Sequence, residues 1–154
     1  MMNDVFNTLF EVSLRSLLVL ETSGNRNITS DMIAAIDFIT VYGKDFGIGD
    51  DNLHGNNSFK FSEFAVRRDN VNKAVKQLSL DGFVTVTVKQ NGFAYSINDV
   101  GIKYCTKFEN EYAESFRTLA RKTWEIVSLK SEREVIELIN WRSVSSVKRS
   151  GIDG

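Results

Sequence analysis

The chain has 154 residues, 42% of them hydrophobic and 25% charged, which is the size and composition of one soluble domain with a substantial core. Its formal net charge of −1 excludes a strong overall attraction to nucleic acid. With one cysteine (Cys105) and one histidine (His54), the chain lacks the residues for an intrachain disulfide or for a structural zinc site.

Features of the N-terminal region favour a cytoplasmic protein. No charged segment followed by an apolar core and a small-residue cleavage site opens the chain, so no signal peptide is expected. The apolar run at residues 17–20 is too short to span a bilayer. We therefore expect a cytoplasmic chain that does not associate with membranes.

The first 60 residues predict two helices and a long loop. Residues 4–21 form an amphipathic helix whose apolar face is wide enough to meet several neighbours or a partner chain. A second helix is predicted at 31–43, capped by Ser30 and ended by Gly43. Residues 44–60 are rich in glycine and asparagine, and a structureless loop of about 17 residues is long enough to suggest function or mobility. The apolar residues of the first helix are Phe6, Leu9, Phe10, Leu14, Leu17 and Leu18.

Residues 62–97 predict a short helix, a second helix and a β-hairpin. In the second helix, apolar side chains recur at the spacing of one helix face. Asp69 is placed to cap this helix, and Gly82 can adopt the left-handed conformation that ends it. The apolar positions are Val71, Ala74, Val75 and Leu78.

The hairpin is predicted from alternation and from its turn. Val84, Val86 and Val88 share one face of the first strand. Asn91-Gly92 favours a type I′ turn with positive φ at both residues. Helix, helix and two-stranded ribbon is the plan of a winged helix-turn-helix domain.

The last third of the chain predicts helices. Asn98 caps a pattern from 99 to 127, which is either one long helix or two helices broken near Asn110. Ser131 and Glu134 form a capping box for a last helix at 131–148, and residues 144–154 are expected to fray.

The predicted fold is thus mainly α-helical with a small β-hairpin wing, in a single domain at residues 1–150. A winged-helix core at 28–98 is preceded by the N-terminal helix 4–21. The helices 99–127 and 131–148 follow it.

No catalytic pattern is found. The chain lacks a nucleophile elbow, a phosphate-binding loop and an HExxH motif. Asp45, Asp50, Asp51 and His54 share one loop, but no second histidine or rigidly spaced carboxylate accompanies them, so a solvated polar loop explains them better. We expect no enzyme activity, no cofactor, no metal and no small-molecule substrate.

Basic residues gather around the second helix of the central unit. Residues 60–90 hold six basic and three acidic residues, a net charge of +3, whereas residues 1–59 hold three basic and eight acidic ones, a net charge of −5. In a winged helix this second helix enters the major groove and the wing contacts phosphates. The surface is open to two interpretations, a DNA-binding face or the solvated face of a protein-interaction module. The candidate contact residues are Arg67, Arg68, Asn72, Lys73, Lys76, Gln77 and Lys89.

Arg67 and Arg68 admit two roles as well. They can contact phosphates, or they can pair with carboxylates inside the fold or on another subunit. Glu63 and Asp69 flank the two arginines, and the predicted recognition helix is weakly charged, so we expect the pairing with carboxylates.

Two stretches resemble the middle component of bacterial ABC three-component systems. FNTLFEVSLRSLLVL, from residue 6, is similar to the opening of that family. The order of Asp-Phe-Gly, Leu-His and Glu-x-x-Val-Arg-Arg, over residues 45–68, is similar to its central pattern. Leu9 departs from the family, in which proline is frequent there, and the loop has glycine and asparagine where the family has proline. The matching residues are Phe6, Asn7, Thr8, Glu11, Leu14, Arg15, Asp45, Gly47, Leu53, His54, Glu63, Val66, Arg67 and Arg68.

The resemblance implies a non-catalytic subunit of a Lamassu-type system for defence against phages and plasmids. Such a subunit would bridge an SMC- or Rad50-like ABC ATPase and a nuclease-like effector, and would hold the effector inactive until foreign double-stranded DNA is sensed. The alternative from the residues alone is a winged-helix transcriptional regulator that dimerises through its C-terminal helices.

Overall fold

The computed structural model describes residues 8–55 and 63–153, with residues 143–153 described by their backbone alone. The chain is mainly helical and has one antiparallel sheet of two strands in this described part. In chain order the elements are α1 (Leu9–Thr22), α2 (Ser30–Val41), the 3₁₀ helix η2 (Gly43–Phe46), α3 (Phe64–Leu80), β1 (Val84–Lys89), β2 (Gly92–Ile97), α4 (Asp99–Cys105), α5 (Glu111–Val127) and α6 (Glu132–Asp153).

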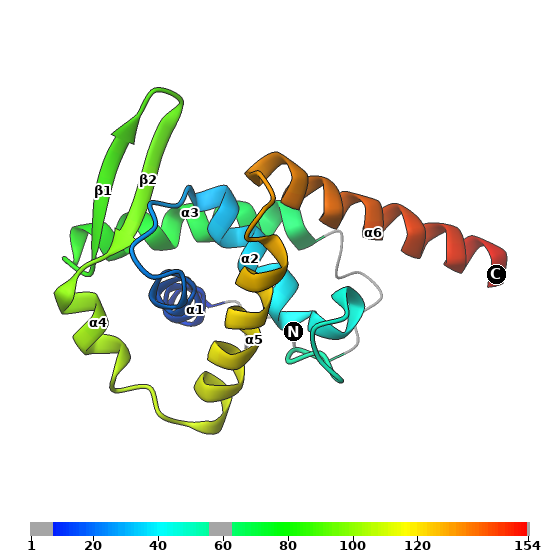
Figure 1. Cartoon of the computed structure of the whole chain (residues 1–154), viewed down its shortest axis with the longest axis horizontal. Coiled ribbons are helices and arrows are strands. Elements are labelled where there is room, and N and C mark those ends of the chain that lie inside the picture. Colours follow the sequence, from blue (N-terminus) through cyan, green and yellow to red (C-terminus); the bar gives the residue numbers. More distant parts are fainter. Residues whose placement is uncertain (1–7, 56–62, 154) are drawn as a thin grey trace.

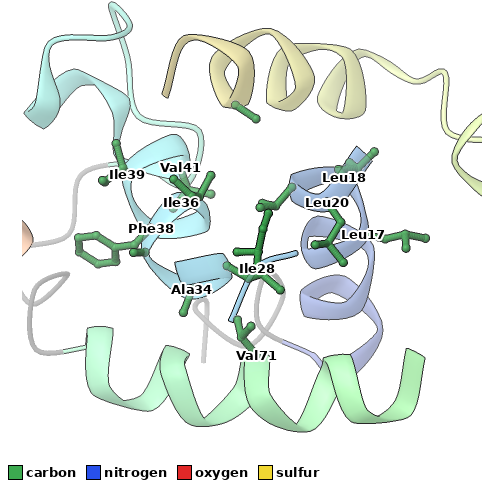
Figure 2. Packing of buried hydrophobic residues seen from close by; sticks show 14 of the residues in the cluster. Leu17, Leu18, Leu20, Ile28, Ala34, Ile36, Phe38, Ile39, Val41 and Val71 are labelled. Carbon is green, nitrogen blue, oxygen red and sulfur yellow. The ribbon is translucent and has the colours of Figure 1, made fainter. Parts of the chain in front are cut away.

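Helix α1 lies at the centre of the molecule, with α2, α3, α4 and α5 around it, while the hairpin projects to one side and α6 extends away (Figure 1). Residues 15–20 are buried on every side of α1, because neighbouring helices surround this part of it. The core consists mainly of aliphatic side chains from α1, α2 and α3 (Figure 2). The helix therefore buries more than the single face predicted from its sequence.

The first turn of α1 is an exception to this burial. Leu9 and Phe10, predicted on the apolar face, are 54% and 61% exposed, while Leu17 and Leu18 are buried as expected. The side chain of Thr8 caps the helix by accepting a hydrogen bond from the backbone N–H of Glu11. The predicted start at residue 4 lies outside the described residues.

Helix α2 begins and ends differently from the prediction. Thr29, not Ser30, is the capping residue, because its hydroxyl accepts the N–H of Met32 at 3.1 Å. The helix ends at Val41, and Gly43 opens η2 instead of ending α2. A side chain at Gly43 would meet the side chain of Ile48 at 2.8 Å, which explains the glycine.

The two helices predicted between residues 62 and 81 are one continuous helix, α3, so that prediction is wrong. Asp69 does not cap a second helix; it lies in mid-helix and pairs with Lys73 at 3.1 Å. Residues 64–80 contain neither glycine nor proline, and their buried positions keep the helical spacing throughout, so nothing interrupts the helix. Gly82, with φ of 85°, follows its end as predicted.

The hairpin is confirmed, but its turn differs. Lys89 pairs with Gly92, so the two-residue loop is Gln90-Asn91 and not Asn91-Gly92. No described residue other than glycine has positive φ, which excludes the predicted type I′ turn at Asn91. The connection between α1 and α2 adds a bridge to the outer side of β2, where Ile28 and Tyr95 exchange backbone hydrogen bonds of 2.9 and 2.7 Å.

The sequence allowed either one helix or two at residues 99–127, and the structure has two, α4 and α5. The break falls at Asn110, whose side chain accepts the N–H of Ala113 at 2.8 Å. Ser131 and Glu134 form the predicted capping box. Helix α6 continues to Asp153, so the residues expected to fray are helical. None of the helices in the described ranges is long and apolar enough to cross a membrane.

Candidate functional site

A buried carboxylate on α2 holds two arginines from two other helices. Asp37 accepts from Nε of Arg15 on α1 at 2.8 Å and from a guanidinium nitrogen of Arg67 on α3 at 2.6 Å. The three side chains are 1% to 3% exposed. The guanidinium of Arg67 also lies over the rings of Phe38 and Tyr42. This arginine cluster (Arg15, Asp37 and Arg67) therefore ties the three central helices together.

The charges of the arginine cluster determine the protonation of Asp37. Burial alone would raise the pKa of this carboxyl group, but Arg15 and Arg67 outweigh the burial and hold the pKa below its usual value. Burial likewise opposes the charge of Arg15, and Asp37 together with Tyr112 raises its pKa nevertheless. The carboxyl group of Asp37 therefore stays ionised at neutral pH, and Arg15 and Arg67 share it.

The loop after η2 lies against the arginine cluster through His54. Its Nε2 is 2.7 Å from the hydroxyl of Tyr112 on α5, and the two rings stack at 6.2 Å between centroids. Burial, followed by the charges of Arg15 and Arg67, lowers the pKa of His54 to about 3. The histidine is therefore neutral at physiological pH and links the loop to α5.

Residues from both stretches that resemble the family converge here. Arg15 comes from the first stretch, and His54, Glu63 and Arg67 come from the second. Glu63 joins them through Tyr42, whose hydroxyl donates to its carboxylate at 3.4 Å. The aromatic ring of Tyr42 also lies edge-on to His54 at 6.4 Å. Segments far apart in the sequence thus build one structural centre.

The remaining motif residues lie away from this centre or outside the described part. Asp45 accepts from the side-chain amide of Asn52 at 3.3 Å, a contact that braces the turn after η2. Glu11 is half-buried on α1. Phe6 and Asn7 lie outside the described residues.

Arg68 pairs with Asp31 on α2 through two hydrogen bonds of 3.2 and 2.8 Å, with both side chains about 40% exposed. Its hydrogen bond to Asp31 raises the pKa of the guanidinium. Both motif arginines therefore meet carboxylates inside the fold, as expected. The partners are Asp37 and Asp31, both on α2, and not the flanking Glu63 and Asp69.

The polar face of α3 carries few unpaired charges. Lys73 pairs with Asp69, and the side-chain amide of Gln77 donates to Asp81 at 3.1 Å. Asn72 is half-buried, and Lys76 is exposed. Lys89 is exposed as well, at the end of β1. Acidic side chains thus offset part of the positive charge that the sequence placed on this face.

The first turns of α1 present apolar side chains beside two hollows. One hollow, of about 390 Å³, lies between α1 and α5, and a second, of about 420 Å³, lies between α1, the end of α3 and α4. Phe10 and Leu14 line both hollows, and Leu9 lines the second. We call these three residues and the two hollows the α1 face.

The side chains of these sites pack against one another and form ion pairs and hydrogen bonds. No group of three histidine, cysteine, aspartate or glutamate side chains within the described ranges is placed to hold a metal ion. Cys105 is buried, and burial raises the pKa of its thiol to about 12, so it stays a thiol. Burial raises the pKa of Tyr112 to about 12 as well.

Two buried charged residues that hold helices together, Asp37 and Arg117, were not identified from the sequence. Asp37 had a recognisable signal, because it is a charged residue within the apolar segment of α2, where a carboxylate needs a buried partner. Arg117 had no such signal. It is 8% exposed, pairs with Glu21 at 2.9 Å and donates to the backbone carbonyls of Cys105 and Phe108, which closes the connection between α4 and α5.

Comparisons with known proteins give one result. Neither the curated proteins nor the solved structures include a match to the chain. The model of the family described as ABC-three component (ABC-3C) system Middle Component 2 matches residues 5–149, and the chain belongs to this family.

Proposed function

We propose that the chain is a non-catalytic accessory subunit of a bacterial defence complex. In this role it bridges an SMC- or Rad50-like ABC ATPase and a nuclease-like effector, and it helps to keep the effector inactive until foreign DNA is present. Membership of a middle-component family supports a subunit role, because a three-component system implies two further components.

The observation that carries the proposal is the α1 face. Leu9 and Phe10 are more than half exposed, although α1 is buried on all sides at residues 15–20. Exposed apolar side chains beside concave surfaces are typical of protein-binding sites. We infer that a partner subunit inserts apolar side chains into the two hollows.

We interpret residues 28–98 as a winged helix. The order of the bridging residue Ile28, α2, α3 and the hairpin supports this assignment, and the one-residue bridge of Ile28 to Tyr95 lies on the outer side of β2. In this interpretation α3 takes the place of the recognition helix, and α2 takes the place of the helix before it.

The same arrangement favours a DNA-binding regulator as the second candidate. A winged helix places its recognition helix in the major groove. The charges argue against it here, because Arg67 and Arg68 pair with Asp37 and Asp31, and Lys73 pairs with Asp69. A bridging subunit is therefore the better explanation of this surface.

The test is co-purification of the tagged chain with the other two components of its system, expressed together. We expect a stable complex from the unsubstituted chain and loss of at least one component from Phe10→Asp. Trp141→Asp is the matched control, because Trp141 is an aromatic residue of similar exposure, 59% against 61%, and lines neither hollow. This variant should assemble normally.

Two further measurements separate the candidate functions. The isolated chain should neither hydrolyse ATP nor cleave DNA, and turnover that survives purification would contradict a non-catalytic role. Tight binding of duplex DNA, lost in Lys73→Ala, Lys76→Ala without loss of assembly, would instead support the DNA-binding regulator.

A further inference from the structure

We propose that the outer edge of β1 binds an extended segment of another component of the system, which adds to the hairpin as a third strand beside β1. This inference rests on the proposed function, since it specifies how one partner is held. The surface is separate from the α1 face.

The hydrogen-bonding register leaves the edge of β1 open. Tyr95 directs its backbone N–H and C=O groups to Ile28, away from β1. Its opposite residue, Val86, therefore belongs to a pair without mutual hydrogen bonds, and the same holds for Val84 and Val88, two residues before and after it. The backbone polar groups of these valines point to the outer edge, where no described segment forms hydrogen bonds with them.

The side chains around this edge are suited to a strand. Val84, Val86 and Val88 lie opposite Ile97, Tyr95 and Phe93 on one face of the hairpin. That face is buried near the helices and exposed towards the tip, where Val88 is 76% and Phe93 54% exposed. An added strand with apolar residues at alternate positions would extend this row and cover Val86 and Val88.

The edge has little of the usual protection against pairing. Edge strands of monomeric proteins are commonly guarded by inward-pointing charges, proline or bulges. The strand sequence is VTVTVK, with β-branched residues at five positions and one charge, Lys89, at its end. The pairing with β2 runs without a bulge from Val84 to Lys89. An edge with this composition is a template for another strand.

The occupant is a flexible segment of a partner and not a second copy of the chain. The hairpin projects beyond the helices (Figure 1), so two copies joined edge to edge would meet mainly through their hairpins. Six residues of strand span about 20 Å, and their pairing covers well under the about 1,200 Å² that a stable interface between rigid proteins buries. An extended segment follows the edge without that constraint. Lys89 favours an acidic residue opposite it.

The test uses proline as an edge block. Val86→Pro and Val88→Pro each remove an N–H that points outward and is not used within the hairpin, so both variants should fold with a melting temperature close to that of the unsubstituted chain. In co-expression with the other two components, we expect at least a tenfold loss of one co-purified component. Val86→Thr is the matched control, because it keeps the N–H and the β-branched shape, and it should retain that component.

The outcomes distinguish failure of strand addition from failure of the proposed subunit role. If the unsubstituted chain assembles and both proline variants assemble equally well while remaining folded, strand addition is wrong and the subunit role stands. If the unsubstituted chain binds neither component, the subunit role is wrong and strand addition to a partner of that system fails with it. In the assembled complex, amide hydrogen exchange at Val86 and Val88 should slow at least tenfold relative to the free chain. Unchanged exchange would also overturn strand addition.

Discussion

Two ion pairs between the same two helices differ in almost every physical respect. Asp37 and Asp31 both lie on α2, and they pair with the sequence neighbours Arg67 and Arg68 on α3. The Asp37 pair is almost completely buried and includes a second arginine from α1. The Asp31 pair is about 40% exposed, and the charge of Glu132 on α6 also acts on Arg68. The two aspartates are six residues apart on α2, which is about 1.7 turns.

The difference shows that burial, and not the presence of an ion pair, determines what each arginine does. A buried charge that loses its partner costs several kcal/mol, whereas an exposed pair contributes at most about 1 kcal/mol because water screens it. Arg67 therefore belongs to the centre of the fold, and Arg68 belongs to its surface. Neither presents an unpaired charge to DNA.

The largest effect is expected from Asp37→Asn. This substitution keeps the size of the side chain but removes the buried negative charge that Arg15 and Arg67 share. We expect the free energy of unfolding to fall by about 3–5 kcal/mol, a large part of the total stability of an ordinary domain. Urea denaturation followed by circular dichroism measures it.

The matched control is Asp31→Asn, which makes the same chemical change at the exposed pair. It should lower the free energy of unfolding by no more than about 1 kcal/mol. Equal losses at Asp37 and Asp31 would show that burial does not separate the two pairs. A loss below about 1 kcal/mol at Asp37 would show that the arginine cluster does not hold the helices together.

A smaller effect on stability is expected from a change of pH, and it should act through His54 beside the buried arginine cluster. The pKa of His54 is lowered to about 3, below its value of 6.5 in an unfolded chain. Between these values the unfolded chain binds a proton that the folded chain does not, so the contribution of His54 to stability is complete above pH 6.5 and is lost as pH falls. From pH 6.5 to pH 5 the free energy of unfolding should decrease by about 1.5–2 kcal/mol.

This pH window isolates the histidine. His54 is the one histidine of the chain. The lowered pKa of Asp37 reduces stability only as pH falls through the ordinary carboxyl range, near about 4, which lies below this window. His54→Gln should remove the pH dependence between 6.5 and 5, and the histidine ring resonances of the unsubstituted chain should show no titration there. Titration near pH 6.5 would mean that His54 is solvated in the folded protein.

The sequence predicted those parts of the fold that depend on local pattern. The apolar spacing of α3, the alternation of the strands, Gly82 and the capping box at Ser131 are all local, and the structure confirms them. The division of α3 into two helices was wrong because Asp69 resembles a cap, yet its carboxylate is used by Lys73 one turn later. An aspartate in such a position can either cap a new helix or pair with a lysine one turn later in the same helix.

Ion pairs between residues far apart in the sequence could not be predicted from local sequence patterns. The sequence predicted that Arg67 and Arg68 pair with carboxylates inside the fold or on another subunit, but it did not identify which ones. The actual partners are 30 and 37 residues away, and only the packing of α2 against α3 brings them together. The α1 face was anticipated as an over-wide apolar surface, but which of its residues stay exposed depends on where the neighbouring helices end.

The smallest effect is expected from the exposed pair itself, and it sharpens the comparison most directly. Arg68→Ala and Asp31→Ala, alone and together, form a double-mutant cycle whose coupling energy should be at most about 1 kcal/mol and should decrease between 0.05 and 0.5 M salt, because salt screens exposed charges. The two hydrogen bonds of the pair favour a value above zero. Urea denaturation of the four proteins at both salt concentrations gives the number. A coupling above about 2 kcal/mol that does not change with salt would place this pair with the buried cluster and remove the distinction between the two arginines.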